Sequence, residues 1–84
     1  MHIICPIHAR ERMEQRGIKR EQIEQTINNP HISLPTEHKR RKRAMRKFGS
    51  KTLDVIYEPR KNNRAVLVTA LWLKNDDRKV GKRK

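Results

Sequence analysis

The sequence predicts an α+β fold in which two N-terminal helices pack on a three- or four-stranded antiparallel sheet. Apolar residues recur four apart within residues 7–28, and they alternate with polar residues within residues 32–58. A run of β-branched and large apolar residues then fills residues 64–73. A chain of 84 residues has room for one domain. We expect a single domain over residues 1–73 and a basic, mobile tail over residues 74–84.

The first helix is expected over residues 7–16. Ala9 and Met13 lie four apart, which places them on one face of a helix. Gly17 can adopt the left-handed conformation that ends a helix, and Ile18 can then fold back onto Met13, as in a Schellman motif. The helix should therefore end at residue 16.

The second helix is expected over residues 20–28. Ile23 and Ile27 again lie four apart, and Glu21 stands near the N-terminal end, where a carboxylate interacts favourably with the helix dipole. Pro30 cannot continue the helix. The two helices form a hairpin whose apolar residues need a sheet to cover.

Strands are expected in the remaining sequence. Residues 32–34 and 52–58 alternate apolar and polar side chains, and the strand over residues 43–48 leads into a turn at Gly49. Residues 64–73 read as a central strand buried on both faces. We expect the helices to cover one face of the sheet and the other face to stay open and carry the positive charge.

The net charge of +13 is unevenly distributed along the chain. Residues 1–37 carry five basic and five acidic side chains, whereas residues 38–84 carry seventeen Lys and Arg and only four Asp and Glu. Such a density of positive charge repels itself unless a polyanion is present, and nucleic acid is the commonest polyanion. The basic half therefore predicts binding to RNA, with DNA as the alternative.

The cysteine content and the apolar runs indicate a cytoplasmic protein that does not contact membranes. Cys5 is the only cysteine, so no disulfide can form within the chain. The longest apolar run covers residues 65–73, far short of the ~20 residues that span a bilayer. No signal-peptide core is expected at the N-terminus.

The basic run of residues 39–47 is the first candidate site. If residues 43–48 form a strand, Arg46 lies on the same face as the apolar Ala44 and Phe48, where an arginine suits a phosphate that it can bind through two oxygens. The alternative is a solvated edge strand whose cations prevent aggregation. The side chains expected to attract the nucleic-acid backbone are Lys39, Arg40, Arg41, Lys42, Arg43 and Lys47.

The second candidate site is a stripe on the first helix. His8, Arg12 and Arg16 are spaced at four residues and share one face. An imidazole beside guanidinium groups fits metal-free RNA cleavage, because histidine can move a proton while arginine stabilises negative charge. The alternative is that both arginines pair with neighbouring glutamates.

Other side chains give weaker signals. His2, Cys5 and His8 have spacings found among metal ligands but lack a fourth ligand, so we expect no metal and no cofactor. Tyr57 and Trp72 could stack on bases or belong to the core.

The opening stretch His8-Ala9-Arg10-Glu11-Arg12-Met13-Glu14-Gln15-Arg16-Gly17-Ile18 resembles a small family of uncharacterised bacterial and phage proteins with a His-Ala-x-x-Arg-Met-x-x-Arg-Gly-Ile pattern. That family resembles the BrnT-like and RelE-like toxins. The resemblance implies helices on a curved antiparallel sheet and metal-independent cleavage of RNA. A further hypothesis, compatible with such a toxin, is that the basic face binds an acidic protein partner such as an antitoxin. It matches His8, Arg12 and Arg16 in the opening pattern, and Arg46 and Thr69 on the sheet.

The sequence thus favours an RNA-binding, metal-independent endoribonuclease of the toxin type. In this hypothesis His8 is the general acid or base, and Arg12 and Arg46 bind the phosphate that is cleaved. The competing hypothesis is a nucleic-acid-binding accessory protein without catalysis.

Overall fold

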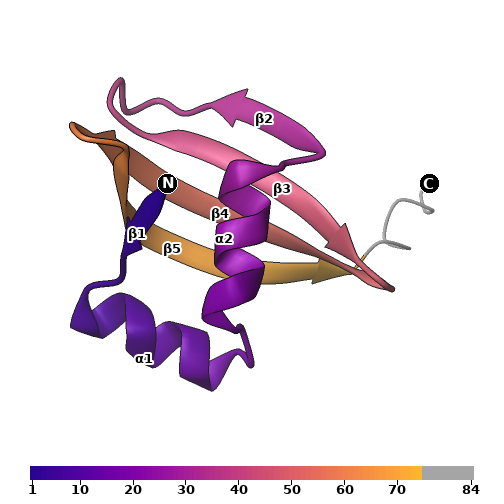
Figure 1. The fold of residues 1–84 in the computed structure, drawn as a ribbon. Coiled ribbons are helices and arrows are strands. Elements are labelled where there is room, and N and C mark those ends of the chain that lie inside the picture. The colour runs from indigo at the N-terminus through magenta and orange to yellow at the C-terminus, as the bar shows by residue number, and fades with distance from the viewer. Residues whose placement is uncertain (75–84) are drawn as a thin grey trace.

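The computed structural model describes residues 1–74, which form two helices and one five-stranded sheet (Figure 1). In chain order the elements are β1 (His2–Ile4), α1 (Ile7–Gln15), α2 (Arg20–Asn28), β2 (Ile32–Pro35), β3 (Lys42–Phe48), β4 (Lys51–Arg60) and β5 (Arg64–Lys74). The strand order is β1-β5-β4-β3-β2. The α+β class and both helices are confirmed. Lys74 belongs to β5, and residues 75–84 of the expected tail lie outside the described residues.

The sheet is larger than expected and it is mixed. β1 pairs with β5 in parallel, whereas the pairs β2–β3, β3–β4 and β4–β5 are antiparallel. The sequence did not reveal β1, because a strand of three residues with a single buried side chain, Ile3, is too short to show alternation.

α2 ends at Asn28 as predicted, and α1 ends one residue earlier than predicted, at Gln15, with the expected turn at Gly17. Gly17 has a φ of +65°, and the Ile18 N–H donates to the Met13 carbonyl at 2.8 Å. This is the backbone hydrogen bond of a Schellman ending. It turns the chain so that α2 crosses the sheet next to α1 (Figure 1).

Both helices cover the same face of the sheet. α1 packs against β5, and α2 packs against β4 and β3 (Figure 1). The buried core between the layers consists of Ile3, Ala9, Met13, Ile18, Ile23, Ile27, Leu53, Val55, Ala65, Leu67 and Ala70. The helical spacing and the strand alternation in the sequence therefore identify the core face correctly.

A bulge in β5 changes which side chains face the core. Ile56 pairs with Thr69, but the next residue, Tyr57, pairs with Leu67, so Val68 is left without a partner in the register. Leu67 and Ala70 are consequently both buried although they lie three apart.

The second face of the sheet is open and mainly apolar, which corrects two expectations. Residues 64–73 are not buried on both faces, since Val66 on the open face is only partly buried. The positive charge does not concentrate there either. Arg43, which pairs with Asp54, and Lys47 lie on this face among the apolar side chains of Ile4, Ile32, Leu34, Met45, Ile56, Val66, Leu71 and Leu73. The free cations lie mainly where the strands end, because the loops carry them.

Candidate nucleic-acid interface

Two connections project from the same end of the sheet. Residues 36–41 join β2 to β3, and residues 61–63 join β4 to β5 (Figure 1). Side chains from both regions line one shallow cavity of about 520 Å³, formed by Arg40, Glu58, Pro59, Arg60 and Lys61. We call residues 36–42 and 58–64 the basic end.

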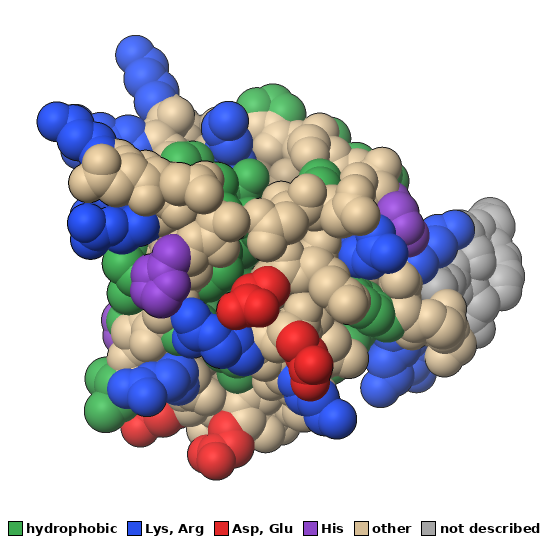
Figure 2. Space-filling model, viewed as in Figure 1, with side chains coloured by type: hydrophobic (Ala, Val, Ile, Leu, Met, Phe, Trp, Pro, Cys, Tyr) green, Lys and Arg blue, Asp and Glu red, His purple; other side chains and the backbone are tan. Residues whose placement is uncertain are grey.

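The basic end concentrates unpaired positive charge. It carries seven Lys and Arg and two Glu. Glu58 takes up two of the cations, with Oε1 3.8 Å from Arg41 Nε and Oε2 2.9 Å from Arg60 Nε. The side chains without an ion pair to any residue of 1–74 are Lys39, Arg40, Lys42, Lys61 and Arg64. In Figure 2, Lys and Arg gather at the upper left over these connections, whereas the acidic side chains lie below them.

Local hydrogen bonds hold the 36–41 loop in shape. The His38 N–H donates to Thr36 Oγ1 at 3.1 Å, the Arg41 N–H donates to the His38 carbonyl at 3.0 Å, and the Arg40 N–H donates to His38 Nδ1 at 3.2 Å. Lys39 and Arg40 are consequently exposed at the tip of a turn that these hydrogen bonds order. The sequence signal that we missed is Thr36, since a threonine hydroxyl often bonds the backbone two residues on.

The 61–63 turn is stabilised by left-handed asparagines. Asn62 and Asn63 have φ values of 64° and 58°, a conformation that asparagine tolerates better than other side chains. The His2 N–H donates to the Asn63 carbonyl at 2.9 Å, which ties the turn to β1. Lys61 is thereby presented to solvent beside the loop.

Tyr57 lies beside the same end. It is partly buried against the core, and burial raises the pKa of its hydroxyl above the usual 10.0. A cavity of about 530 Å³ adjoins it, lined by Ser33, Leu34, Pro35, Thr36, Lys39, Arg41, Lys42 and Tyr57. The sequence left open whether Tyr57 stacks on bases or fills the core, and its partial burial is compatible with both.

Arg43 is already engaged by the protein. Its Nε and Nη2 donate to Asp54 Oδ1 and Oδ2 at 2.9 and 2.6 Å, and the hydrogen bond to Asp54 raises the pKa of Arg43 above its ordinary value. The register places this pair on the open face of the sheet, and Asp54 is only 6% exposed there. Thr69 and Lys47 also lie on the open face, away from the basic end.

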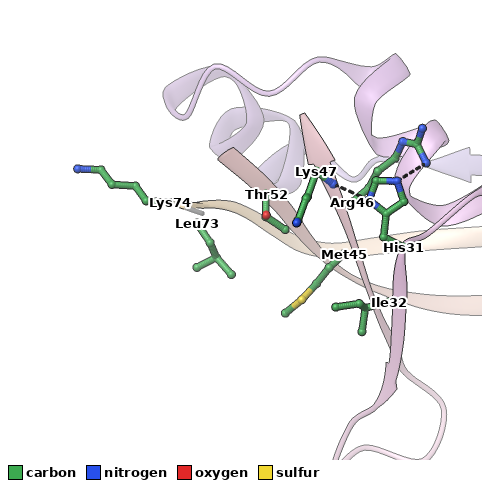
Figure 3. Close-up of a pocket in the computed structure, with 8 residues that line it drawn as sticks. All are labelled: His31, Ile32, Met45, Arg46, Lys47, Thr52, Leu73 and Lys74. Atoms are coloured by element: carbon green, nitrogen blue, oxygen red, sulfur yellow. Dashed lines mark hydrogen bonds between the residues drawn. The ribbon is translucent and has the colours of Figure 1, made fainter. Parts of the chain in front are cut away.

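Arg46 closes the C-terminal end of α2. Its Nη1 donates to the Asn29 carbonyl at 2.7 Å and lies 3.2 Å from His31 Nε2, and its guanidinium is 5.9 Å from the centre of the Phe48 ring. The Lys47 N–H donates to His31 Nδ1 at 3.1 Å (Figure 3). This network satisfies a carbonyl at the helix end, a role that the sequence pattern did not reveal.

A groove of about 360 Å³ runs beside this network. Figure 3 shows its lining side chains, which are His31, Ile32, Met45, Arg46, Lys47, Thr52, Leu73 and Lys74. The apolar members belong to the open face, and the cations stand at the margin.

The α1 stripe is divided between two roles. Arg16 Nη1 donates to the Ala70 carbonyl at 2.7 Å and so binds α1 to β5. His8 and Arg12 are exposed, and their side chains form no hydrogen bond or ion pair with any described residue, so pairing of Arg12 or Arg16 with glutamate is not observed. Within residues 1–74, no hydrogen bond, ion pair or ring contact joins Arg46 to His8 or Arg12. Arg46 lies on β3 beside the end of α2, whereas α1 packs on β5.

Residues 1–74 contain neither a cluster of metal-ligating side chains nor a helix that could span a membrane. No group of three or more His, Cys, Asp or Glu among them could hold a metal ion, and His2, Cys5 and His8 do not form one. None of the helices described is long and apolar enough to cross a membrane.

Comparison with known protein families gives one match. Residues 7–72 match the model of DUF4258, a domain of unknown function. No curated protein and no solved structure matches the chain. The match covers both helices and nearly all of the sheet except β1, which lies before it. The expected relation to a small uncharacterised family is therefore confirmed, and the chain belongs to the DUF4258 family.

Proposed function

We propose that the protein binds RNA through its basic end. The observation that carries the proposal is the set of five cations there without an ion pair to a described residue. Three lie on two connections that are held in shape by hydrogen bonds, and Lys42 and Arg64 begin the strands that follow them. Unpaired cations on a fixed surface bind the phosphate backbone by releasing its counterions, and this attraction is independent of base sequence.

Fluorescence anisotropy of labelled single-stranded RNA at increasing salt tests this proposal. Each phosphate contact contributes a slope of about −0.7 to log K against log salt for single strands, so five contacts predict a slope of about −3.5. DNA of the same sequence serves as the comparison. Affinity that does not change with salt, or the absence of binding, would contradict the proposal.

Metal-independent RNA cleavage of the RelE-like and BrnT-like type is a second candidate function. The observation in its favour is that His8 and Arg12 are exposed, unpaired and one helical turn apart. His8 would take the proton of a ribose 2′-hydroxyl while the hydroxyl oxygen bonds to the adjacent phosphorus. The P–O5′ bond would then break, the leaving O5′ would take a proton from water, and Arg12 would stabilise the phosphate charge. The products are a 2′,3′-cyclic phosphate and a 5′-hydroxyl.

Incubation of the protein with labelled RNA and EDTA tests for cleavage. A catalyst should release cyclic-phosphate ends, and His8→Ala and Arg12→Ala should lose turnover while keeping affinity for RNA. Arg10→Gln is the control from the same helix. Intact RNA at protein concentrations that fully bind it would leave the protein a binding module without catalysis.

An acidic protein of the antitoxin kind is the partner we propose for the open face. Ile4, Ile32, Leu34 and Leu73 are 37%, 51%, 40% and 36% exposed there, with cations such as Lys47 and Lys74 at the margin. A second copy of the chain, with its net charge of +13, would be repelled.

A synthetic peptide tests this assignment. An amphipathic helical peptide with leucines on one face and glutamates on the other should bind the protein, and its scrambled counterpart should not. Equal binding of both peptides would overturn this assignment.

A further inference from the structure

The cavity beside Tyr57 has the position of a ligand site at the edge of the basic end. Tyr57 and Lys42 lie opposite each other in the β3–β4 register, and they point to the same side of the sheet as the buried Val55. The loop of residues 36–41 stands over the same space, since Thr36 and Lys39 also line it. At about 530 Å³ the cavity falls within the range of small-molecule pockets.

The lining combines an aromatic ring with cations. Lys39 and Lys42 are exposed and have no ion pair with a residue of the described chain. Arg41 also lines the cavity, but its Nε lies 3.8 Å from Glu58, which points to the other face of the sheet. The cations best placed for a ligand are therefore Lys39 and Lys42.

Tyr57 is the aromatic side chain best placed to meet a ligand. Trp72 packs edge-on against Phe48, with ring centres 6.0 Å apart at 87°, and the ammonium of Lys51 lies 5.8 Å from the centre of its ring. The Tyr57 side chain, by contrast, is only partly buried and lines the cavity.

We infer that this cavity binds one unstacked nucleobase of an RNA strand, with Tyr57 stacking on the base and Lys39 and Lys42 holding the adjacent phosphates. The inference rests on the proposed RNA binding and adds its substrate class, which is single-stranded rather than duplex RNA. Bases within a duplex are stacked on their neighbours, so only a strand with free bases can fill the cavity.

The affinity of the wild-type protein for two oligonucleotides of equal charge tests the inference. A uridine oligonucleotide should bind about tenfold more tightly than an abasic ribose-phosphate strand of the same length, because base–aromatic stacking is lost in the second. Equal affinity for both strands would overturn the base-binding cavity and leave RNA binding by the basic end intact. Binding of neither strand would overturn both proposals.

Substitutions of Tyr57 locate the effect. Tyr57→Phe keeps a stacking ring and should retain the preference for the uridine strand, whereas Tyr57→Leu should lose the preference while binding the abasic strand as wild type does. The abasic strand thereby reports whether each variant is folded. A preference that survives in Tyr57→Leu would show that the base binds elsewhere.

Discussion

Two arginines of the helical layer, Arg16 and Arg20, hold the fold together, whereas at the basic end most cations have no ion pair with a residue that the structure describes. Arg16 donates to the Ala70 carbonyl at 2.7 Å, and Arg20 donates to the Ile3 carbonyl and pairs with Glu24 at 3.2 Å. At the basic end, by contrast, Lys39 and Lys61 extend into solvent without an ion pair to any residue that the structure describes.

The difference shows that the two groups of cations satisfy different needs. A carbonyl at a sheet edge or a helix end lacks a backbone donor, and the long fork of an arginine supplies one. Cations on a fixed turn without such a carbonyl repel one another, and they are stabilised only when an anion arrives. The first group should therefore matter for stability and the second for affinity.

The largest expected effect on stability comes from the Arg43–Asp54 pair. Arg43→Leu leaves the nearly buried Asp54 carboxylate without its two hydrogen bonds and should lower the free energy of unfolding by about 3 kcal/mol. Urea denaturation measures this loss, and adding Asp54→Asn to the variant should recover part of it. A loss below about 1 kcal/mol would show that the pair does not support the fold.

The next largest effect on the free energy of unfolding is expected at Arg46, because this side chain caps α2 and lies against Phe48. Arg46→Ala should lower the free energy of unfolding by about 1.5 kcal/mol, and Arg46→Lys should restore little because an ammonium lacks the guanidinium fork. A variant of unchanged stability that no longer cleaves RNA would instead make Arg46 catalytic.

Arg16 and Arg12 form a matched pair on one stripe of α1. Arg16→Gln removes the hydrogen bond to the Ala70 carbonyl and should cost about 1 kcal/mol of stability. Arg12→Gln removes no such bond and should stay within about 0.5 kcal/mol of wild type. Thermal unfolding of the two variants compares them directly, and equal losses would remove the distinction between their roles.

The smallest effect concerns Cys5. Burial raises the pKa of its thiol above the usual 9.0, although Arg20 and Arg10 act in the opposite direction. Folding therefore favours the protonated thiol, and its contribution to stability is present below the ordinary pKa and is lost as the pH rises through the raised one. Iodoacetamide should alkylate Cys5 more slowly in the folded protein than in urea at about pH 8. Equal rates would show that folding does not protect the thiol.

Periodicity in the sequence was sufficient to predict the core and most elements. The spacing of Ile23 and Ile27 and the alternation around Val55 identified the buried faces correctly. The parallel strand β1 and the bulge at Val68 depend on contacts with residues far along the chain, so no local pattern indicates them.

The candidate site was harder to predict because a cation's role depends on its partner. Arg43 and Arg46 were expected to bind phosphate, yet they are held by Asp54 and Asn29, whereas Lys39 and Arg40 have no ion pair with a described residue. These partners come from other elements and become visible only when the chain is folded.

RNA affinity in two charge-matched variants tests the central claim most directly. Lys39→Gln with Arg40→Gln removes one lysine and one arginine from the basic end. Lys19→Gln with Arg10→Gln removes the same number from the N-cap of α2 and from α1. At about 0.15 M salt the first variant should bind single-stranded RNA about tenfold more weakly than wild type, and its salt slope should fall by about 1.4. The second should stay within about twofold of wild type. Equal losses in both variants would mean that net charge alone governs binding, which would contradict an interface at the basic end.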